Sequence, residues 1–521
     1  MNKTAKFLFN GSLLAATTLL LRLTGLGFSA YISRQLGAEG TGLISLVNTV
    51  YGFGITFAVS GIYLACIRLC SAAIGRKNDY ELHTALQKSF LYAAFFGFLS
   101  CLLFTSLASF AGTRFLQDGR TVDSIRMLAI ALPFISLTTV TDAYFASVGR
   151  VYKSAVSDIC EQAVKIISGM ILLKSSIPFG TQASVLAVTK SNCIGEIAAF
   201  FVSIVLYLHD IRTTSFAGER NICKTESLLR ISLPIAFSTY ARSGLVTLEH
   251  SLIPKGLQRY GADKTDALSA YGVVRGMALP IILFPACLLS AFTGLLVPEL
   301  TEDHTINDQN AINRKSSQAI RISSAFSVIT AVILFLFGNE LGMSIHKNEQ
   351  AGFYIRCFSV LIPFMYCDTT ADSLLKGLDK QVYTMIVNII DAAVSVLFTW
   401  KIIPKLGIRG YVITVFMTEI LNFSCSAGKL SQMTMLNFNP GNDLFVPICV
   451  TAGTGIFVRK ILSVVRTANI NLYCIFGIGC SLLISIPLVA RYSFINEWDR
   501  IRFIAKKKTT EPFWGSVARE N

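Results

Sequence analysis

Charged residues are scarce in this chain of 521 residues: Asp, Glu, Lys and Arg make up 15% of it, whereas 53% is hydrophobic. This composition, with a mean hydropathy of +0.57, excludes an ordinary soluble globular protein. No connector between the apolar runs exceeds about 20 residues, which leaves no room for a soluble catalytic domain. The formal net charge is +15, yet no soluble basic domain with interleaved aromatic residues is present, which argues against a nucleic-acid partner. An anionic membrane surface and an anionic lipid substrate are better partners for this charge.

Metal-binding motifs are also missing from the sequence. The chain has 13 cysteines but no C-x-x-C pair with metal spacing, and its five histidines form no H-E-x-x-H motif. We interpret the cysteines as small buried apolar side chains and place the histidines at or near loops. We therefore expect neither a metal nor a cofactor.

Most of the sequence consists of long apolar runs. Each run has about the 20 or more residues that a helix needs to cross a bilayer. They predict an all-α polytopic membrane protein with about fourteen transmembrane helices, and an N-terminal helix that is not a cleaved signal peptide. The runs are 7–33, 43–69, 84–111, 123–148, 154–178, 184–208, 228–253, 267–297, 318–339, 353–375, 381–403, 408–434, 442–465 and 469–490.

The spans group into two sets of six, followed by two more. The expected parts are an N-terminal six-helix lobe (1–208), a cytoplasmic connector (209–227), a second six-helix lobe (228–434), two extra transmembrane helices (435–490) and a basic cytoplasmic tail (491–521). Lysines and arginines favour the loops on the side of the termini, although the bias is slight without the tail. We expect a multi-pass protein of a bacterial cytoplasmic membrane with both termini in the cytoplasm.

An internal repeat links the two sets of six. Pro133 lies early in the fourth span and Asp142 follows nine residues later; Pro363 and Asp372 repeat this spacing in the tenth span. Each proline removes a backbone donor and is expected to kink its helix. Two repeated halves around a central site are a transporter architecture, and an even number of spans makes the halves parallel copies.

Three arginines, Arg22, Arg242 and Arg275, fall deep within predicted spans. A charge at mid-membrane costs roughly 2.5–3.5 kcal/mol on insertion scales, so it usually faces the bundle interior or a wet cavity. A guanidinium keeps its proton and pairs bidentately with phosphate. We therefore predict a cationic cavity for a phosphate or pyrophosphate, with pairing to internal carboxylates as the alternative. Glu249, two helical turns after Arg242, is one such partner.

Other charged residues have more than one interpretation. Arg68 ends the second span and either contacts substrate or reaches the membrane surface. Arg34 and Glu39 flank the first polar hinge and either act in gating and headgroup contact or are solvated. Asp142, Asp372 and Glu249 are candidates for coupling transport to H⁺ or Na⁺.

The segment Tyr31-Ile32-Ser33-Arg34-Gln35-Leu36-Gly37-Ala38-Glu39-Gly40-Thr41-Gly42-Leu43, followed by Val50-Tyr51-Gly52 and Ser60-Gly61-Ile62, resembles the stage V sporulation protein B family. These are polysaccharide-biosynthesis membrane proteins of the multidrug/oligosaccharidyl-lipid/polysaccharide exporter superfamily. The resemblance implies two six-helix lobes around a V-shaped cavity, and a cavity lined by arginines from spans one, two and eight. Arg22 and Arg275 fit that pattern, while Arg68 lies nearer the membrane edge.

The same resemblance implies the function. We expect a monomeric flippase, not an enzyme, that moves an undecaprenyl-pyrophosphate-linked saccharide such as lipid II or a polysaccharide repeat unit by alternating access, in sporulation or cell-wall synthesis. Membrane lipids and a coupling H⁺ or Na⁺ would be its other partners. A cation-coupled multidrug antiporter of the same superfamily is the first alternative. A membrane-embedded polysaccharide polymerase or transferase is the second, although neither a large loop nor a clustered acid or metal motif supports it.

Overall fold

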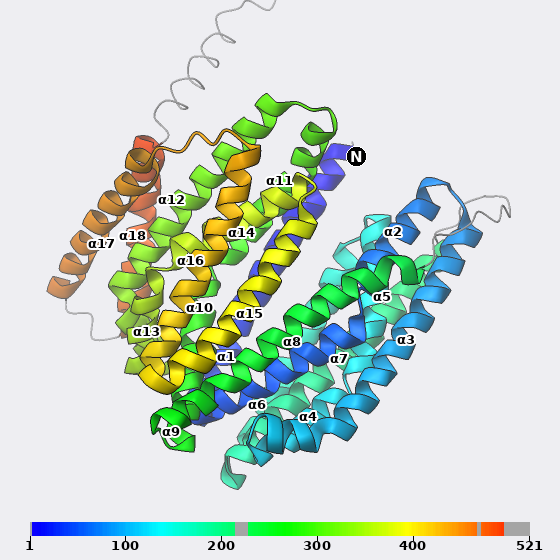
Figure 1. Cartoon of the computed structure of the whole chain (residues 1–521), viewed down its shortest axis with the longest axis horizontal. Coiled ribbons are helices and arrows are strands. Elements are labelled where there is room, and N and C mark those ends of the chain that lie inside the picture. Colours follow the sequence, from blue (N-terminus) through cyan, green and yellow to red (C-terminus); the bar gives the residue numbers. More distant parts are fainter. Residues whose placement is uncertain (1–2, 214–227, 466–469, 494–521) are drawn as a thin grey trace, which may run out of the picture.

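The structure is a computed structural model that describes residues 3–213, 228–465 and 470–493, and every regular element in these ranges is a helix (Figure 1). The prediction of an all-α fold is therefore confirmed. Most of the predicted connector (209–227) and nearly all of the predicted tail (491–521) lie outside the described residues.

The first half of the chain contains α1 (Lys3–Val59), α2 (Ile62–Gly75), α3 (Asp79–Phe110), η1 (Ala111–Phe115), η2 (Gly119–Thr121), α4 (Val122–Ala129), α5 (Leu132–Val148), α6 (Tyr152–Ser176), η3 (Ile177–Phe179) and α7 (Thr181–Thr213). The second half contains α8 (Leu228–Tyr260), α9 (Lys264–Gly272), η4 (Val273–Ala278), α10 (Leu279–Leu283), α11 (Ala286–Thr305), α12 (Gln309–Leu341), η5 (Gly342–His346), α13 (Glu349–Ser359), α14 (Ile362–Gly377), α15 (Gln381–Leu406) and α16 (Ile408–Met433). Three further elements, η6 (Gly441–Phe445), α17 (Val446–Val465) and α18 (Ile470–Ser493), follow and pack beside α12.

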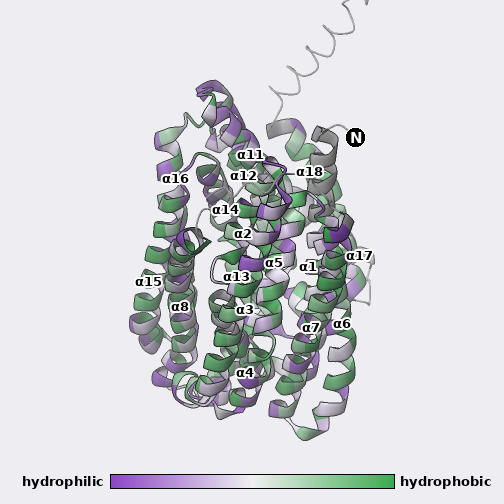
Figure 2. Cartoon of the chain, turned by 90° about the vertical axis from the view of Figure 1, so that its right-hand side faces the viewer, coloured by the Kyte–Doolittle hydropathy of each residue, from purple (hydrophilic) through white to green (hydrophobic). Residues whose placement is uncertain are grey.

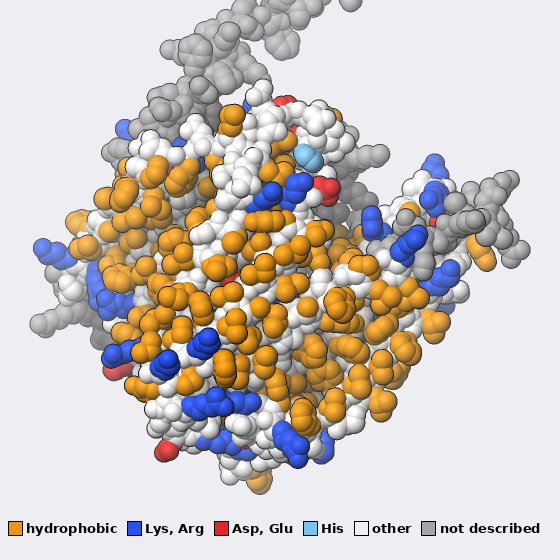
Figure 3. Space-filling view, in the orientation of Figure 1, with side chains coloured by type: hydrophobic (Ala, Val, Ile, Leu, Met, Phe, Trp, Pro, Cys, Tyr) orange, Lys and Arg blue, Asp and Glu red, His pale blue; other side chains and the backbone are white. Residues whose placement is uncertain are grey.

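The surface of the bundle has the pattern of a membrane protein. Hydrophobic side chains cover the middle of the face in Figure 3, while Lys and Arg gather towards its two ends. Hydrophobic residues also run along most of the helices in Figure 2. Within the described residues, eight helices are long and apolar enough to cross a membrane, or nine if the bent pair Gly119–Ala129 and Leu132–Val148 counts as one span.

The remaining predicted spans coincide with helices that carry charged residues. Among them, α6, α8, α14 and α16 carry acidic residues such as Glu161, Glu249, Asp368 and Glu419, which lower their hydropathy. Such residues inside a membrane usually face the bundle interior. The count of fourteen spans stays a prediction.

The first predicted span and most of the second lie in one helix, α1, which reverses at a single residue. The second span then continues across a break at Ser60 and Gly61 into α2. Only Gly37 leaves helical geometry, with φ 68° and ψ −168°, a region that favours glycine. The sequence predicted a polar hinge over the ten residues 33–42, which is wrong: the residues on both sides of Gly37 are helical. The start of α1 and the end of α18 lie at the same end of the bundle, opposite this reversal (Figure 1).

The two halves repeat the same backbone features at one constant offset in the sequence. Left-handed residues pair as Lys77 with Asn307, Gln117 with Lys347, and Gly149 with Asp379. The same offset relates the helix caps Asn78 and Asp308, whose side chains each accept a backbone hydrogen bond. The repeat predicted from Pro133 and Pro363 therefore extends to the turns and caps.

Close backbone packing joins the halves at the end where α1 reverses. A Cβ atom on Gly42 would overlap the carbonyl oxygen of Leu268 in α9, and one on Gly272 would overlap the carbonyl oxygen of Ala38. Gly276 in η4 is packed in the same way against Thr41. The buried core continues across this contact, because Leu43 and Tyr271 belong to one hydrophobic cluster. This end of the bundle is closed by backbone contact.

The substitution Gly272→Ala tests this packing. Because the neighbouring atoms are backbone, they cannot move aside as a flexible side chain would, and we expect destabilisation of about 1–3 kcal/mol. A fall in the thermal unfolding midpoint of the detergent-solubilised protein would report it. Gly479→Ala in α18 is the matched control, since nothing lies within contact distance of a Cβ there. Equal midpoints for both variants would contradict the close approach.

Candidate functional site

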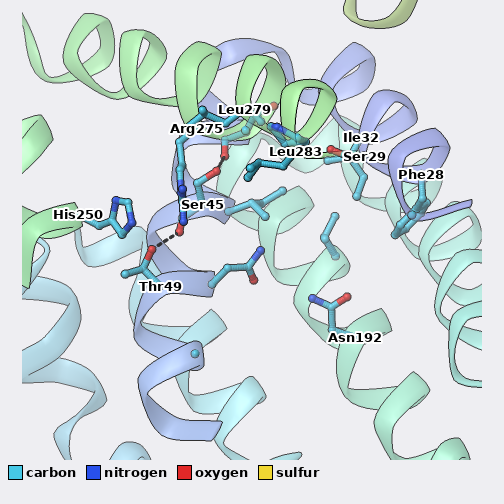
Figure 4. A pocket seen from close by; sticks show the side chains of 18 of the residues that line it. Phe28, Ser29, Ile32, Ser45, Thr49, Asn192, His250, Arg275, Leu279 and Leu283 are labelled. Carbon is cyan, nitrogen blue, oxygen red and sulfur yellow. Dashed lines mark hydrogen bonds between the residues drawn. The ribbon is translucent and has the colours of Figure 1, made fainter. Parts of the chain in front are cut away.

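A cavity of about 630 Å³ lies between the two halves, next to the closed end. Its lining comes from α1, α6 and α7 on one side and from α8, η4 and α10 on the other. Figure 4 shows Arg275 and His250 on one side of it, and Asn192 on the other. The size matches that of cavities that hold drug-sized ligands.

Arg275 is the one predicted arginine that lines this cavity. It belongs to η4, a π-helix, and its half-buried side chain extends beside Ser45 and Thr49 of α1 (Figure 4). Within the described residues its guanidinium has neither a hydrogen bond nor an ion pair. The Glu249 carboxyl lies close enough to interact with this charge. Because the guanidinium makes no hydrogen bond within the described residues, its N–H groups remain available to an anion.

The other predicted arginines lie farther from the closed end. Arg242 lines a second cavity of about 620 Å³, which shares Ser243 and Val246 with the first. Arg22 lies about one helical turn before Gly25 on α1, whereas Gly25 itself lines the first cavity. Arg68 lies one turn after Leu64, which lines the second cavity.

All three of these side chains are exposed, and none has an ion pair within the described residues. Arg275 and Arg242 therefore line two adjoining cavities, while Arg22 and Arg68 lie about one helical turn from residues that line them. They do not converge on one point.

Sequence reasoning missed the polar residues of the opposite wall. Lys165, Gln162 and Asn192 line the cavity from α6 and α7, and Asn48 lines it from α1. Lys165 lies near the middle of the apolar run 154–178, but its signal was weaker than that of Arg22 because the same run also contains Asp158, Glu161 and Lys174. The amides gave none, because a single Asn or Gln in a helix has no distinctive spacing.

The histidines were predicted at or near loops, which is wrong for His250. It is buried within α8, lines the cavity, and its ring lies 6.1 Å from the ring of Tyr271. The prediction failed because the predicted span ended at residue 253, whereas α8 continues to Tyr260.

The three carboxylates predicted for ion coupling lie in separate places. Asp142 in α5 has a buried oxygen, Oδ1, without a hydrogen-bond partner. The Asp372 carboxylate in α14 accepts hydrogen bonds from Asn388 (3.3 Å) and Ser426 (3.2 Å). Glu249 in α8 forms no ion pair with Arg242 within the described residues, so the internal pairing considered for that arginine is absent there.

Asp372 is part of a larger buried polar group. Asp368, one turn earlier on α14, accepts a hydrogen bond of 3.0 Å from Asn422 of α16 and leaves its Oδ1 without a partner. Two carboxyl groups thus lie together among amides and a hydroxyl. Such a group can hold a proton or a small cation.

Pro133 and Pro363 lie in the first turn of α5 and α14, where a proline costs no helical hydrogen bond. Each follows a break of two residues, and the break before Pro133 bends the chain by 42°.

Glu39 is engaged at the closed end. Its carboxylate forms a 2.7 Å ion pair with Arg120, which also pairs at 2.8 Å with Asp118. Lys264, from the second half, lies 3.5 Å from the same Asp118. Arg120 donates hydrogen bonds to Asp118 through its side chain and backbone, and these hold the pKa of the Asp118 carboxyl below its ordinary value against the opposing effect of burial.

Arg34 is also engaged at this end. Its Nε donates to the carbonyl oxygen of Ile345 at 2.7 Å, and its Nη2 donates to that of Ser344. The hydroxyl oxygen Oγ of the neighbouring Ser33 lies 2.6 Å from Nδ1 of the buried His346, within hydrogen-bond distance. A cation at the carbonyl end of a helix is electrostatically favourable. Arg34 thus joins α1 to η5 and is not directed at the cavity.

Comparisons with known proteins agree with this architecture. Residues 7–254 match the family model described as polysaccharide biosynthesis protein, and residues 258–400 match the MatE model. Stage V sporulation protein B of Bacillus subtilis is 21% identical over 509 residues, 96% of this chain and 98% of that protein. Lipid II flippase MurJ of the same organism is 22% identical over 454 residues, 80% of this chain and 81% of that protein.

Two solved structures share the fold. An inward-closed conformation of the lipid II flippase MurJ superposes with a TM-score of 0.63 at 14% identity, covering 94% of this chain and 99% of that one. An inward-facing multidrug resistance MATE transporter of the MOP superfamily also gives 0.63 at 14% identity, covering 80% and 96%.

The substitution Asp118→Asn tests the ion pairs at the closed end. A carboxyl with a lowered pKa in the folded state contributes stability above its unfolded pKa, near 3.9, and loses it as the pH falls through the folded pKa. We expect a lower unfolding midpoint than in the wild type, by an amount that is constant from pH 8 to about pH 5. Asp263→Asn is the control, because this exposed residue has no ion pair within the described residues. A difference that vanishes at neutral pH would show that the pairs contribute nothing.

Proposed function

This chain belongs to the exporter superfamily that includes stage V sporulation protein B and the lipid II flippase, and we propose that it flips an undecaprenyl-pyrophosphate-linked saccharide across the cytoplasmic membrane of a bacterium. The cargo would be a lipid II-like peptidoglycan precursor or a polysaccharide repeat unit, in spore cortex or cell-wall synthesis. The protein would act as a transporter and not as an enzyme.

The observation that carries the proposal is the guanidinium of Arg275, which lines a cavity between the two halves and has no hydrogen bond or ion pair within the described residues. Arg275 comes from the second half and Lys165 from the first, so one lipid headgroup in the cavity could contact both halves. Arginine binds the oxygens of phosphate with two parallel hydrogen bonds, and a pyrophosphate offers several such oxygens. An anionic headgroup in this cavity would supply the partner that Arg275 lacks.

We propose that the exposed arginines guide the headgroup into the cavity. Arg242 lines the cavity that adjoins the one at Arg275, and Arg22 and Arg68 are exposed about one helical turn from residues that line these cavities. The lipid tail would remain in the bilayer beside the two lobes, residues 1–208 and 228–434. The closed end would then open as the lobes rock, which requires breaking the contacts of Gly272 and of Arg34.

The orientation of the protein gives the direction of transport. With both termini in the cytoplasm, the closed end faces outside, and the headgroup moves outwards. The membrane potential assists the outward movement of an anion by about 2.3 kcal/mol per charge per 100 mV, so two negative charges gain roughly 4–5 kcal/mol.

Transport is proposed to be coupled to H⁺ or Na⁺ through Asp372 and Asp142, with Glu249 as a further candidate. Asp372 and its neighbour Asp368 form a buried group that changes its charge when it binds a cation. Asp142 occupies the equivalent position in the other half.

A multidrug antiporter is the second candidate function. It is favoured by the MatE match over residues 258–400 and by carboxyl groups in the interior of α5, α14 and α15, where Asp142, Asp368 and Asp391 each have a buried oxygen without a hydrogen-bond partner within the described residues. Such a protein would export a cationic compound in exchange for H⁺ or Na⁺. Export of a cationic dye by vesicles, unaffected by Arg275→Ala, would favour this function over the flippase.

The flippase proposal predicts that Arg275→Ala slows flipping roughly tenfold or more, because a charged hydrogen-bond partner of the headgroup is lost. The rate of flipping should fall less in Arg275→Lys, because lysine keeps the positive charge. The measurement is the accessibility of a lipid-linked saccharide headgroup on the far side of reconstituted vesicles, with Arg22→Ala tested in parallel. Arg409→Ala, an exposed cation outside both cavities, is the control. Undiminished flipping in both Arg275→Ala and Arg22→Ala would contradict the cationic site.

The coupling proposal predicts a different effect for Asp372→Asn. The amide keeps the size of the carboxylate but cannot carry its charge, so flipping should no longer respond to an imposed H⁺ or Na⁺ gradient, while headgroup binding stays within about twofold. Asp379→Asn is the control, because this exposed residue has positive φ, which asparagine tolerates. A gradient response equal to that of the wild type would exclude Asp372.

A further inference from the structure

The two walls of the cavity have different chemistry. Arg275 and apolar residues such as Leu279 and Leu283 form the wall from the second half. The wall from α6 and α7 contains two amides and one ammonium, Gln162, Asn192 and Lys165, which we call the ledge. Figure 4 shows Asn192 across the cavity from Arg275. An anion site and a hydrogen-bonding surface therefore face each other.

The amides of the ledge are held in place but not fully used by the protein. Gln162 Nε2 lies 3.5 Å from the position of a Cβ on Gly25, so this amide packs directly against the backbone of α1. Asn192 Oδ1 is buried and has no hydrogen-bond partner. Buried polar atoms are normally paired, because an unpaired one is costly. A ligand in the cavity would supply the missing partner.

The chemistry of an amide restricts what that partner is. Asn and Gln side chains both donate and accept hydrogen bonds, whereas phosphate oxygens only accept. Hydroxyl and acetamido groups also do both, so they match the ledge better than a phosphate does. The ledge is therefore suited to a sugar, and Arg275 to the pyrophosphate that carries it.

Lys165 does not make the ledge a second anion site. Glu161 lies one turn before it on α6, and Glu196 projects from α7, close enough for both carboxyl groups to interact with the Lys165 charge. Gly195 brings α7 into close contact with α6 here, since a Cβ on it would lie 3.1 Å from Cβ of Lys165 and 3.2 Å from the carbonyl oxygen of Glu161. The Lys165 charge is thus offset by neighbouring carboxyl groups. A sugar with its own carboxylate would therefore find no free positive charge on this wall.

We propose that Gln162, Lys165 and Asn192 form a saccharide subsite that selects a neutral, N-acetylated sugar next to the pyrophosphate and disfavours a uronic acid. This inference rests on the proposed flippase function, because it places the sugar by its attachment to a pyrophosphate at Arg275. It assigns specificity to residues of α6 and α7, which none of the arginines provides.

The experiment measures binding of three lipids to the purified full-length protein in nanodiscs. The probes are undecaprenyl pyrophosphate without a sugar, the same lipid carrying N-acetylglucosamine, and the same lipid carrying glucuronic acid. The double variant Gln162→Ala/Asn192→Ala should lose roughly tenfold or more in affinity for the N-acetylglucosamine lipid, since two neutral hydrogen-bonding groups are removed. Its affinity for the lipid without sugar should stay within about twofold of the wild type.

Two comparisons separate the subsite from a general defect. Arg275→Ala should weaken binding of all three lipids, whereas Asn471→Ala on α18, outside this cavity, should change none. The double variant Glu161→Gln/Glu196→Gln should raise affinity for the glucuronic acid lipid severalfold and leave the N-acetylglucosamine lipid unchanged. Misfolding of the variant cannot explain this result, because misfolding would lower the affinity for the glucuronic acid lipid and not raise it.

The outcomes distinguish the two proposals. If the wild type binds none of the three lipids, the flippase function fails. If it binds all three and the Gln162→Ala/Asn192→Ala variant keeps wild-type affinity for the N-acetylglucosamine lipid, or loses affinity equally for the lipid without sugar, the subsite is wrong while the function stands. Wild-type binding that does not distinguish the two sugars would overturn the proposed exclusion of acidic sugars.

Discussion

A guanidinium inside a membrane protein cannot lose its proton, so it must contact water, a carboxylate or an anion. This constraint explains the surroundings of the arginines in the cavity and at the closed end. Within the described residues, Arg275 lines a cavity and makes no hydrogen bond or ion pair, while Arg34 and Arg120 at the closed end bind carbonyl oxygens and carboxylates. The same residue type is thus used in two ways. At the closed end arginines hold helices together, and in the cavity one is left available for a ligand.

The closed end and the cavity depend on each other. Gly42, Gly272 and Gly276 let α1 approach α9 and η4 closely. Arg275 belongs to η4 and lies in the sequence between Gly272, the last residue of α9, and Gly276. Any movement that separates α1 from η4 therefore also moves the guanidinium relative to α6 and α7. Under the proposed function, the position of the headgroup and the state of the closed end are coupled through this one short π-helix, with no need for a longer pathway.

The sequence predicted the helices well and the cavity only in part. Apolar runs located each helical region because the bilayer demands about 20 apolar residues, and the repeat of Pro133 and Pro363 extends to the caps and turns of both halves. Lone charges located Arg275, but the same reasoning did not reveal that Glu39 and Arg34 are bound at the closed end, since their partners are distant in sequence. Gln162 and Asn192 were invisible because a single amide on a helix has no periodic signal. Close approach of glycine backbones likewise depends on tertiary contact, and only the folded chain displays it.

The lipid that accompanies the protein through purification tests the central claim most directly. Native mass spectrometry of the wild-type protein released from mild detergent should detect a bound polyprenyl-pyrophosphate saccharide, and the Arg275→Ala variant purified in parallel should retain much less of it. Ordinary phospholipids alone on the wild type, or the same pyrophosphate lipid retained in equal amount by both proteins, would contradict the account of Arg275 as the anion-binding group of the cavity.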